Sequence, residues 1–198
     1  MAKKIAITGG IGSGKSAAAQ YIQSLGFPVF SCDEIYKQLI KTEEYIASVA
    51  SLFPEAIINS AIDKRKLSEI VFFDNTKRNA LNNLAHPLIM KTLYAHMENC
   101  EEPFVFAEVP LLFEGNFEKD FDFVFVIQRN LDERISAVVS RDNISEENVK
   151  QRIAAQFDYT NTSNIKLQQT NVITIFNHSS KEDLFEKIKT ILSNFKII

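Results

Sequence analysis

The chain has 198 residues, of which 45% are apolar, and this length and composition suit one compact globular domain with insertions. Its net charge of −3 at pH 7 gives no overall basic field, so we expect no nucleic-acid partner. We also expect a soluble, cytoplasmic protein, because no signal peptide opens the sequence and no apolar run approaches the roughly 20 residues of a membrane span.

The first thirty-odd residues have the pattern of a strand, a glycine turn, a helix and a second strand. Ile5–Thr8 is a short apolar run of the kind found in buried parallel strands, and two glycines end it. Lys15–Leu25 has apolar residues on one helical face, and Gly26 is placed to stop this helix. With a short second strand at Phe27–Phe30, these elements predict a βαβ unit.

Residues 34–100 have an interrupted helical pattern in which no strand is expected. Apolar stripes recur at helical spacing, and Asp63 is placed to cap one of the helices. His86 precedes Pro87, and this proline is expected to break or restart the helix that contains it. We therefore predict a helical insertion that packs against one edge of a sheet.

The strand pattern returns in the second half of the chain. Apolar runs predict three more strands, at Phe104–Ala107, Phe121–Ile127 and Asn171–Phe176. Leu131–Val139 is predicted to be a helix, and a charged segment over 141–158 follows it. Strands that alternate with helices predict an α/β fold with a five-stranded parallel sheet covered on both faces, within one domain over residues 1–198. Helix caps are expected at Ser145 and Ser180.

The strongest signal is the segment Gly9–Ser16, which matches the P-loop pattern G-x-x-x-x-G-K-[ST] in full. Glycines let consecutive N–H groups point into one concavity, and the helix that starts near Lys15 adds its positive end. The Lys15 ammonium can bridge the β- and γ-phosphates, and the Ser16 hydroxyl can bind Mg²⁺. We therefore predict that ATP is bound by Gly10, Ile11, Gly12, Ser13, Gly14, Lys15, Ser16 and Ala17, with Ser16 as the metal ligand.

A P-loop indicates a nucleoside triphosphate but does not by itself indicate a kinase. A switch GTPase would need a D-x-x-G element and an N-K-x-D base reader, and neither string occurs in the chain. A transport or motor ATPase is usually larger. A helical insertion beside the P-loop and a late charged insertion are instead typical of small kinases, in which a lid over residues 141–158 would keep water from the γ-phosphate.

Two acidic residues follow predicted strands, at the edge of the sheet where parallel sheets bind their ligands. Asp33 can accept the proton of an acceptor hydroxyl, or it can cap the helix that follows. Glu108 can hold Mg²⁺ through water, face the acceptor, or be an exposed acid at the end of a strand.

Basic residues near the charged segment are candidates for the transferring phosphate. Arg134 and Arg141 are seven residues apart and so share a helical face, and Arg152 follows them. These arginines can clamp the phosphoryl group, or they can be part of a solvated surface. His86 alone is more typical of a helix end than of a catalyst. Cys32 and Cys100 form no C-x-x-C pair and are expected to be free thiols.

Taken together, these segments resemble the dephospho-coenzyme A kinase family over residues 4 to about 190. The resemblance is carried by the P-loop and by Asp33, and by segments that occur in the same order as in that family. These are His86-Pro87-Leu88-Ile89, Pro110-Leu111-Leu112-Phe113-Glu114, Arg134 with Arg141-Asp142, Gln156, and Val172-Ile173 with Asn177. Where the family usually has Asp-Ala-Asp, this chain has Ser31-Cys32-Asp33, and Glu108 and Asn171 stand where Asp is usual.

The resemblance implies transfer of the ATP γ-phosphate to the ribose 3′-hydroxyl of dephospho-CoA, the last step of CoA synthesis. It implies a CoA-binding insertion over residues 34–100 and a lid over 141–158. Lys15, Asp33 and Arg141 would be catalytic, and Asn177 would lie near the adenine. The substrate-binding residues would be Asp33, His86, Glu108, Leu111 and Glu114.

Two rival hypotheses remain at this point. A kinase of the same fold can act on a nucleoside monophosphate or another small alcohol, and a non-catalytic module can bind nucleotide without turnover. For the proposed kinase we expect ATP and Mg²⁺ as cofactors, small-molecule ligands as partners, and a monomer or small homo-oligomer.

Overall fold

The computed structural model describes residues 2–72, 74–178 and 180–198. The chain forms two compact units. Met1–Phe30 and Met97–Ile198 make up the first, here called the sheet unit, and Ser31–His96 make up the second, here called the helical unit. Each unit is described by itself below.

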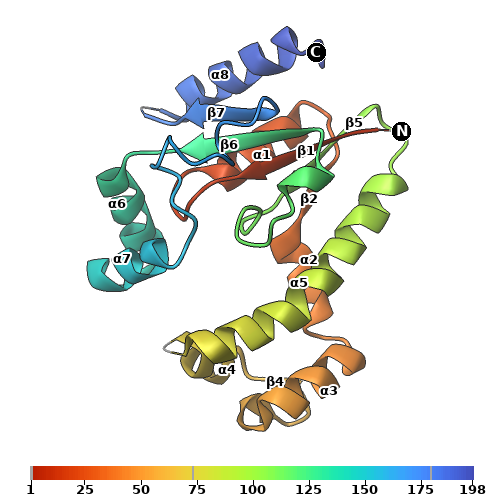
Figure 1. Cartoon of the computed structure of the whole chain (residues 1–198), viewed down its shortest axis with the longest axis vertical. Helices are drawn as coiled ribbons and strands as arrows, with labels where there is room; N and C mark the ends of the chain where they lie inside the picture. The colour runs from red at the N-terminus through yellow and green to blue at the C-terminus, as the bar shows by residue number, and fades with distance from the viewer. Residues whose placement is uncertain (1, 73, 179) are drawn as a thin grey trace. The chain divides into compact units, whose positions relative to one another are not determined.

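A five-stranded sheet forms the centre of the fold, with the strand order β2-β5-β1-β6-β7 (Figure 1). The strands β5, β6 and β7 pair in parallel with their neighbours, β5 and β6 on either side of β1 and β7 beside β6. The bounds are β1 Lys3–Thr8, β2 Val29–Ser31, β5 Phe104–Glu108, β6 Phe123–Gln128 and β7 Val172–Phe176. The predicted α/β fold with five strands is confirmed, and its strand positions differ from the prediction by two residues or fewer.

Helices α1 (Lys15–Ser24) and α8 (Lys181–Asn194) pack together against one face of this sheet (Figure 1). Their apolar residues meet those of the strands in one core cluster, which contains Ala18, Ala19, Ile22, Leu184, Ile188, Leu192, Ile5, Ile7, Phe106, Phe125, Ile127 and Ile175. The alternate strand residues Ala6, Val105 and Val124 are also fully buried, so both faces of the sheet are covered.

The remaining elements of the sheet unit lie in its second half. Helix α6 (Leu131–Asp142) packs against α7 (Glu146–Ala154), and Val138 and Val149 are fully buried in their shared cluster. A short 3₁₀ turn, η2, covers Glu118–Asp120. The segment from the end of α7 to β7 has no helix or strand, and it returns to the P-loop region through the contacts described below.

The helical unit contains most of the predicted insertion and differs from the prediction in two places. Its elements are α2 Cys32–Leu39, α3 Glu43–Leu52, η1 Pro54–Ala56, β3 Ile57–Ile58, β4 Ala61–Ile62, α4 Lys64–Phe72 and α5 Asn75–Glu98, the last of which ends beyond the unit. The expectation that this segment holds no strand is wrong, because β3 and β4 pair as a small antiparallel hairpin. Its two turn residues, Asn59 and Ser60, both have positive φ, as a tight hairpin requires.

The second difference concerns Pro87, which does not break its helix. Helix α5 runs through this proline without interruption. A proline inside a helix costs about 3 kcal/mol, because it lacks an N–H and crowds the preceding turn. Ala85, Met90 and Leu93 on either side of it are buried, and keeping them on one continuous helix offsets that cost.

Three predicted helix caps are confirmed. The carboxylate of Asp63 accepts hydrogen bonds from the backbone N–H groups of Arg65 and Lys66, at 2.9 and 3.0 Å. The hydroxyls of Ser145 and Ser180 accept from the third residue of their helices. The capping role considered for Asp33 is wrong, because α2 already begins at Cys32 and Asp33 lies inside its first turn.

Two smaller expectations concern the thiols and the membrane. Cys100 is a free thiol, as expected, and Cys32 is buried at the start of α2. Over the described ranges, no helix is both long enough and apolar enough to cross a bilayer.

Candidate active site

The P-loop connects β1 to α1 through a backbone that only glycine adopts easily. Gly12 and Gly14 have φ values of +77° and +103°, and Gly14 is the residue directly before the helix. The N–H of Ser13 donates to the Gly10 carbonyl at 3.1 Å, which closes a tight turn. Because the first N–H groups of a helix have no partner within it, the start of α1 is suited to bind an anion.

Glu108 lies beside the P-loop and contacts its serine. It is the last residue of β5, where the parallel pairing with β1 sets it opposite Ile7. The hydroxyl of Ser16 donates to its Oε1 at 2.8 Å, and Glu108 is only 8% exposed. The alternative of an exposed surface acid is therefore wrong. The Lys15 ammonium donates to the Gly10 carbonyl at 3.4 Å, so it lies along the same loop.

This arrangement fits a magnesium-bound nucleotide. In P-loop proteins Mg²⁺ is held by the serine hydroxyl, by phosphate oxygens and by water, so no protein cage of several ligands is needed. The described part of the chain holds no group of three or more His, Cys, Asp or Glu side chains that would bind a metal. Because the Ser16 hydroxyl is the donor in its hydrogen bond to Glu108, this bond does not use the lone pairs with which its oxygen would bind a metal ion.

Arg134 lies under the P-loop instead of on a solvated helix face. It is 6% exposed, and its Nε donates to the Ile11 carbonyl at 2.9 Å. Its guanidinium is so close to Gly10 that a Cβ built on this glycine would be 2.2 Å from one of the terminal nitrogens. Burial lowers the pKa of the Arg134 guanidinium, while the nearby Tyr159 and Asp158 act in the opposite direction.

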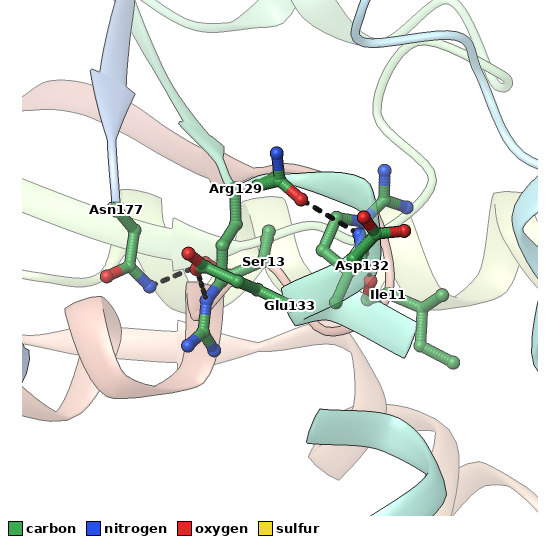
Figure 2. A network of polar contacts seen from close by, with 8 residues as sticks. Ile11, Ser13, Arg129, Asp132, Glu133 and Asn177 are labelled. Atoms are coloured by element: carbon green, nitrogen blue, oxygen red, sulfur yellow. Dashed lines mark hydrogen bonds and ion pairs between the residues drawn. The ribbon is translucent and has the colours of Figure 1, made fainter. Parts of the chain in front are cut away.

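Asn177 supports the same loop from the end of β7. Its amide donates to the Ser13 carbonyl at 2.9 Å, and the residue is only 8% exposed (Figure 2). Figure 2 also shows Arg129 at the end of β6, where its Nε donates to Glu133 at 2.8 Å. Asn177 and Arg134, which come from separate elements, thus both bond carbonyl groups of the predicted ATP-binding loop.

Arg141 and Arg152 lie on the surface, away from the buried contacts of Arg134. Arg141 binds Asp142 with two parallel hydrogen bonds of 2.7 and 3.0 Å, and its side chain is 62% exposed. These bonds raise the pKa of Arg141 and lower that of Asp142. Arg152 from α7 approaches the same carboxylate at 3.7 Å. Exposed pairs of this kind contribute little stability, so the fork of Arg141 can change partners easily.

Glu114, from the Pro-Leu-Leu-Phe-Glu segment, contacts the chain beyond α7. Its Oε1 accepts from the Phe157 N–H at 2.8 Å, and its Oε2 is buried with no hydrogen-bond partner among the described residues. Leu111 is half-buried at the start of the same turn. Lys166 holds this turn in place, because its ammonium reaches the Phe113 carbonyl at 2.6 Å and the buried carboxylate of Glu118 at 3.2 Å.

Two further predicted site residues, Asp33 and His86, belong to the helical unit. Asp33 is exposed in the first turn of α2, two residues after the end of β2. His86 is half-buried inside α5, and burial lowers the pKa of its imidazole, which favours the neutral form at pH 7. The structure therefore brings the P-loop, Glu108 and Asn177 together within the sheet unit, and it assigns Asp33 and His86 to the other unit.

Two polar contacts of the P-loop region were not predicted from the sequence. Gln156 accepts a hydrogen bond from the Ile11 N–H at 2.8 Å, and the Tyr159 hydroxyl is 3.1 Å from that of Thr8. In the sequence, Gln156 is only one of the residues that carry the family resemblance, and the resemblance implies no role for it. A single glutamine and a single tyrosine in a polar segment have no spacing that would indicate such contacts.

A family model described as dephospho-CoA kinase matches residues 3–183. The chain belongs to the dephospho-CoA kinase family. A dephospho-CoA kinase of Thermus thermophilus is 34% identical over 96% of this chain and 90% of its own length. One from Fusobacterium nucleatum is 32% identical over 93% of this chain and 94% of its own length. The expectation of an ATP-dependent kinase is therefore confirmed, and the hypothesis of a non-catalytic module is set aside.

Solved structures agree with this assignment. A crystal structure of a Thermus thermophilus protein has a TM-score of 0.82 at 33% identity and covers 98% of this chain and 97% of its own. A dephospho-CoA kinase from Campylobacter jejuni has a TM-score of 0.68 at 25% identity, with 98% of both chains covered. Shikimate kinase from Acinetobacter baumannii, at 17% identity and a TM-score of 0.59 over 98% of this chain and 95% of its own, shares the fold.

Proposed function

We propose that the protein transfers the γ-phosphate of ATP to the ribose 3′-hydroxyl of dephospho-CoA, giving CoA and ADP in the last step of CoA synthesis. The acceptor is suggested by the family match over residues 3–183. The observation that carries the proposal is the assembled phosphate cradle, in which Ser16 at the start of α1 is bonded to the buried Glu108. The charge and the N–H groups of this cradle suit a triphosphate.

The P-loop would bind ATP through residues 10–17 and would position its γ-phosphate. Lys15 would place its ammonium on the β- and γ-phosphates, where it stabilises the charge that develops during transfer. Ser16 would hold Mg²⁺, which when bound neutralises the same oxygens. Glu108 would accept the hydrogen bond of the Ser16 hydroxyl and so orient it, or it would face the acceptor. Asn177 would keep the loop in shape beside the adenine.

The acceptor side of the proposal rests on the helical unit and the adjoining loops. Residues 34–100 would bind dephospho-CoA, and the exposed carboxylate of Asp33 would accept the proton of the attacking hydroxyl. Its place directly after β2 supports this role, because parallel sheets bind their ligands at the carboxyl ends of the strands. The remaining contacts to the acceptor are assigned to His86, Glu108, Leu111 and Glu114.

One assay tests the proposal against the rival acceptors. ADP release from ATP is measured with dephospho-CoA, with nucleoside monophosphates, with shikimate and with water alone. We expect rapid release only with dephospho-CoA, one CoA formed for each ADP, and no turnover of an acceptor analogue that lacks the 3′-hydroxyl. Faster turnover of a nucleoside monophosphate, or equal turnover of the deoxy analogue, would show that the acceptor or its reacting group is wrong.

The lid hypothesis gives a separate prediction for Arg141. We propose that residues 141–158 close over ATP and that Arg141 then leaves Asp142 to stabilise the transferring phosphate. Arg141→Lys keeps the charge but loses the planar fork, so we expect kcat to fall by roughly 10²-fold while the melting temperature is unchanged. The matched control is Lys189→Arg, which exchanges one exposed cation for another on α8, outside the insertion and the lid. If both variants turn over like the wild type, Arg141 is only a surface charge.

A further inference from the structure

Both backbone polar groups of Ile11, the third residue of the P-loop, are bonded to side chains. Its N–H donates to Gln156 Oε1 at 2.8 Å, and its carbonyl accepts from Arg134 Nε at 2.9 Å. Arg134 comes from the first turn of α6, and Gln156 lies two residues past the end of α7. Side chains from α6 and from the segment just after α7 are therefore bonded to one and the same residue of the phosphate loop.

Gln156 is itself held in place by the segment that follows it. The Phe157 N–H is bonded to Glu114, and the Tyr159 carbonyl accepts from the Gln128 amide at 2.5 Å. The rings of Phe157 and Tyr159 pack against each other and against Phe113, with centroids 4.7 to 6.0 Å apart. Because this segment is fixed at several points, the Gln156 amide is already positioned to accept the Ile11 N–H. Forming this hydrogen bond therefore costs little additional conformational entropy.

The contact divides the N–H groups of the P-loop into two sets. The Ile11 N–H is used by Gln156 and the Ser13 N–H by the Gly10 carbonyl, whereas the other N–H groups that follow Ile11 lie in the turn into α1. Two of the residues in that turn, Gly12 and Gly14, have positive φ and great backbone freedom, so the turn alone fixes its shape weakly. A loop whose start is anchored can present its remaining N–H groups to phosphate without first losing that freedom.

We infer that Gln156 is a positioning residue that sets the P-loop for phosphate binding by holding the Ile11 N–H. The inference rests on the proposed ATP site at the P-loop, but not on the identity of the acceptor. Gln156 is a better probe of this role than Arg134, because removing a neutral amide changes no charge near the phosphates. Its hydrogen bond to the loop uses the side-chain oxygen, which a substitution can remove or keep.

Three variants separate positioning from a general loss of structure. Gln156→Ala removes the oxygen that accepts the hydrogen bond from Ile11. Gln156→Asn shortens the side chain by one methylene, and Gln156→Glu keeps an oxygen at the same distance from the backbone. The matched control is Gln23→Ala, which changes an exposed glutamine in the last turn of α1, outside the P-loop, the insertion and the lid. Each protein is examined by calorimetry with ADP and with dephospho-CoA, by hydrogen exchange of the Ile11 amide, and by thermal melting.

In Gln156→Ala and Gln156→Asn we expect the Ile11 amide hydrogen to exchange faster with solvent. We also expect both variants to bind ADP about tenfold more weakly, as the loss of one oriented hydrogen bond would cause. Dephospho-CoA affinity should hold, and the melting temperature should fall by no more than about 2–4 °C. Gln156→Glu should keep the Ile11 amide protected, although its charge will weaken ADP binding, and Gln23→Ala should match the wild type.

Two results would overturn the inference. Unchanged Ile11 exchange in Gln156→Ala and Gln156→Asn would show that the bond does not hold the loop. Faster exchange with wild-type ADP affinity would show that the bond exists but does not prepare the phosphate site. Measurements on the wild type distinguish a failure of this inference from a failure of the proposed function. If the wild type binds ADP but does not phosphorylate dephospho-CoA, the proposed acceptor is wrong. The role of Gln156 is then still decided by the variants.

Discussion

Replacing Lys15 with alanine is expected to reduce phosphoryl transfer by roughly 10³-fold or more, since single stabilising donors in active sites already contribute 10²–10³-fold and Lys15 also carries a charge. The ammonium lies along the loop, at 3.4 Å from the Gly10 carbonyl, where the predicted phosphates would bind. The fold should be intact, because Lys15 is the first residue of α1 and alanine is the best helix former. The measurements are kcat for ADP release with dephospho-CoA, circular dichroism and the melting temperature.

The control for this variant is Lys189→Ala, which removes an exposed lysine from α8 and changes the net charge by the same amount. We expect it to have wild-type turnover. A folded Lys15→Ala protein with wild-type turnover would remove the P-loop from the mechanism, and with it the proposed use of ATP at this site.

The second large effect is expected at Asp33. If its carboxylate accepts the proton of the acceptor hydroxyl, Asp33→Asn should lower kcat by roughly 10²–10⁴-fold, the usual contribution of a general base. ATP affinity should be unchanged, because the P-loop contacts lie in the sheet unit and none of them uses Asp33. Stability should fall only slightly, because an exposed acid in the first turn of a helix contributes about 0.3–1 kcal/mol through the helix dipole. The measurements are kcat, ATP affinity and the melting temperature.

Glu34→Gln provides a matched control within the same turn. Glu34 is also exposed near the start of α2, and it also pairs with Lys37, so its loss removes one negative charge and at least as much helix stability. If Asp33 acts only on the helix, the two variants will have the same, nearly wild-type rate. That result would indicate that the hydroxyl proton passes directly to the γ-phosphate.

The sheet unit was largely predictable because its signals are local. A parallel strand buried on both faces is a continuous apolar run, and all five such runs became strands. The P-loop pattern predicts the turn between β1 and α1. Because parallel strands end at the same edge of a sheet, Glu108 at the end of its strand is expected near this turn. The bond between Ser16 and Glu108 agrees with that expectation.

The errors arose where local patterns compete with packing. The strands β3 and β4 have two residues each, too few to show a period of two, and only the positive φ of Asn59 and Ser60 reveals the turn. Proline lacks an N–H and crowds the preceding turn, which predicts a helix end at Pro87. Burial of the residues around it keeps α5 continuous instead. Asp33 was considered as a cap because the start of its helix was placed too late in the sequence.

The side chains that support the P-loop could not have been predicted from spacing. Arg134 is 123 residues from Ile11, and Gln156 is 145 residues from it, so only the assembled fold brings them together. From the sequence, Arg134 was a candidate either for the phosphoryl group or for solvent. Its burial contradicts the solvated alternative, and its Nε is bonded to the Ile11 carbonyl.

The close approach of Arg134 to Gly10 has a consequence for how these sequences can diverge. Gly10 does not have the positive φ of its neighbours Gly9 and Gly12, so its backbone would accept any small residue. The three heavy atoms nearest to a Cβ built there all belong to the Arg134 guanidinium, the closest of them at 2.2 Å. Among related chains, alanine or serine at position 10 should therefore occur together with a shorter residue at position 134, so that the two sites evolve as a pair.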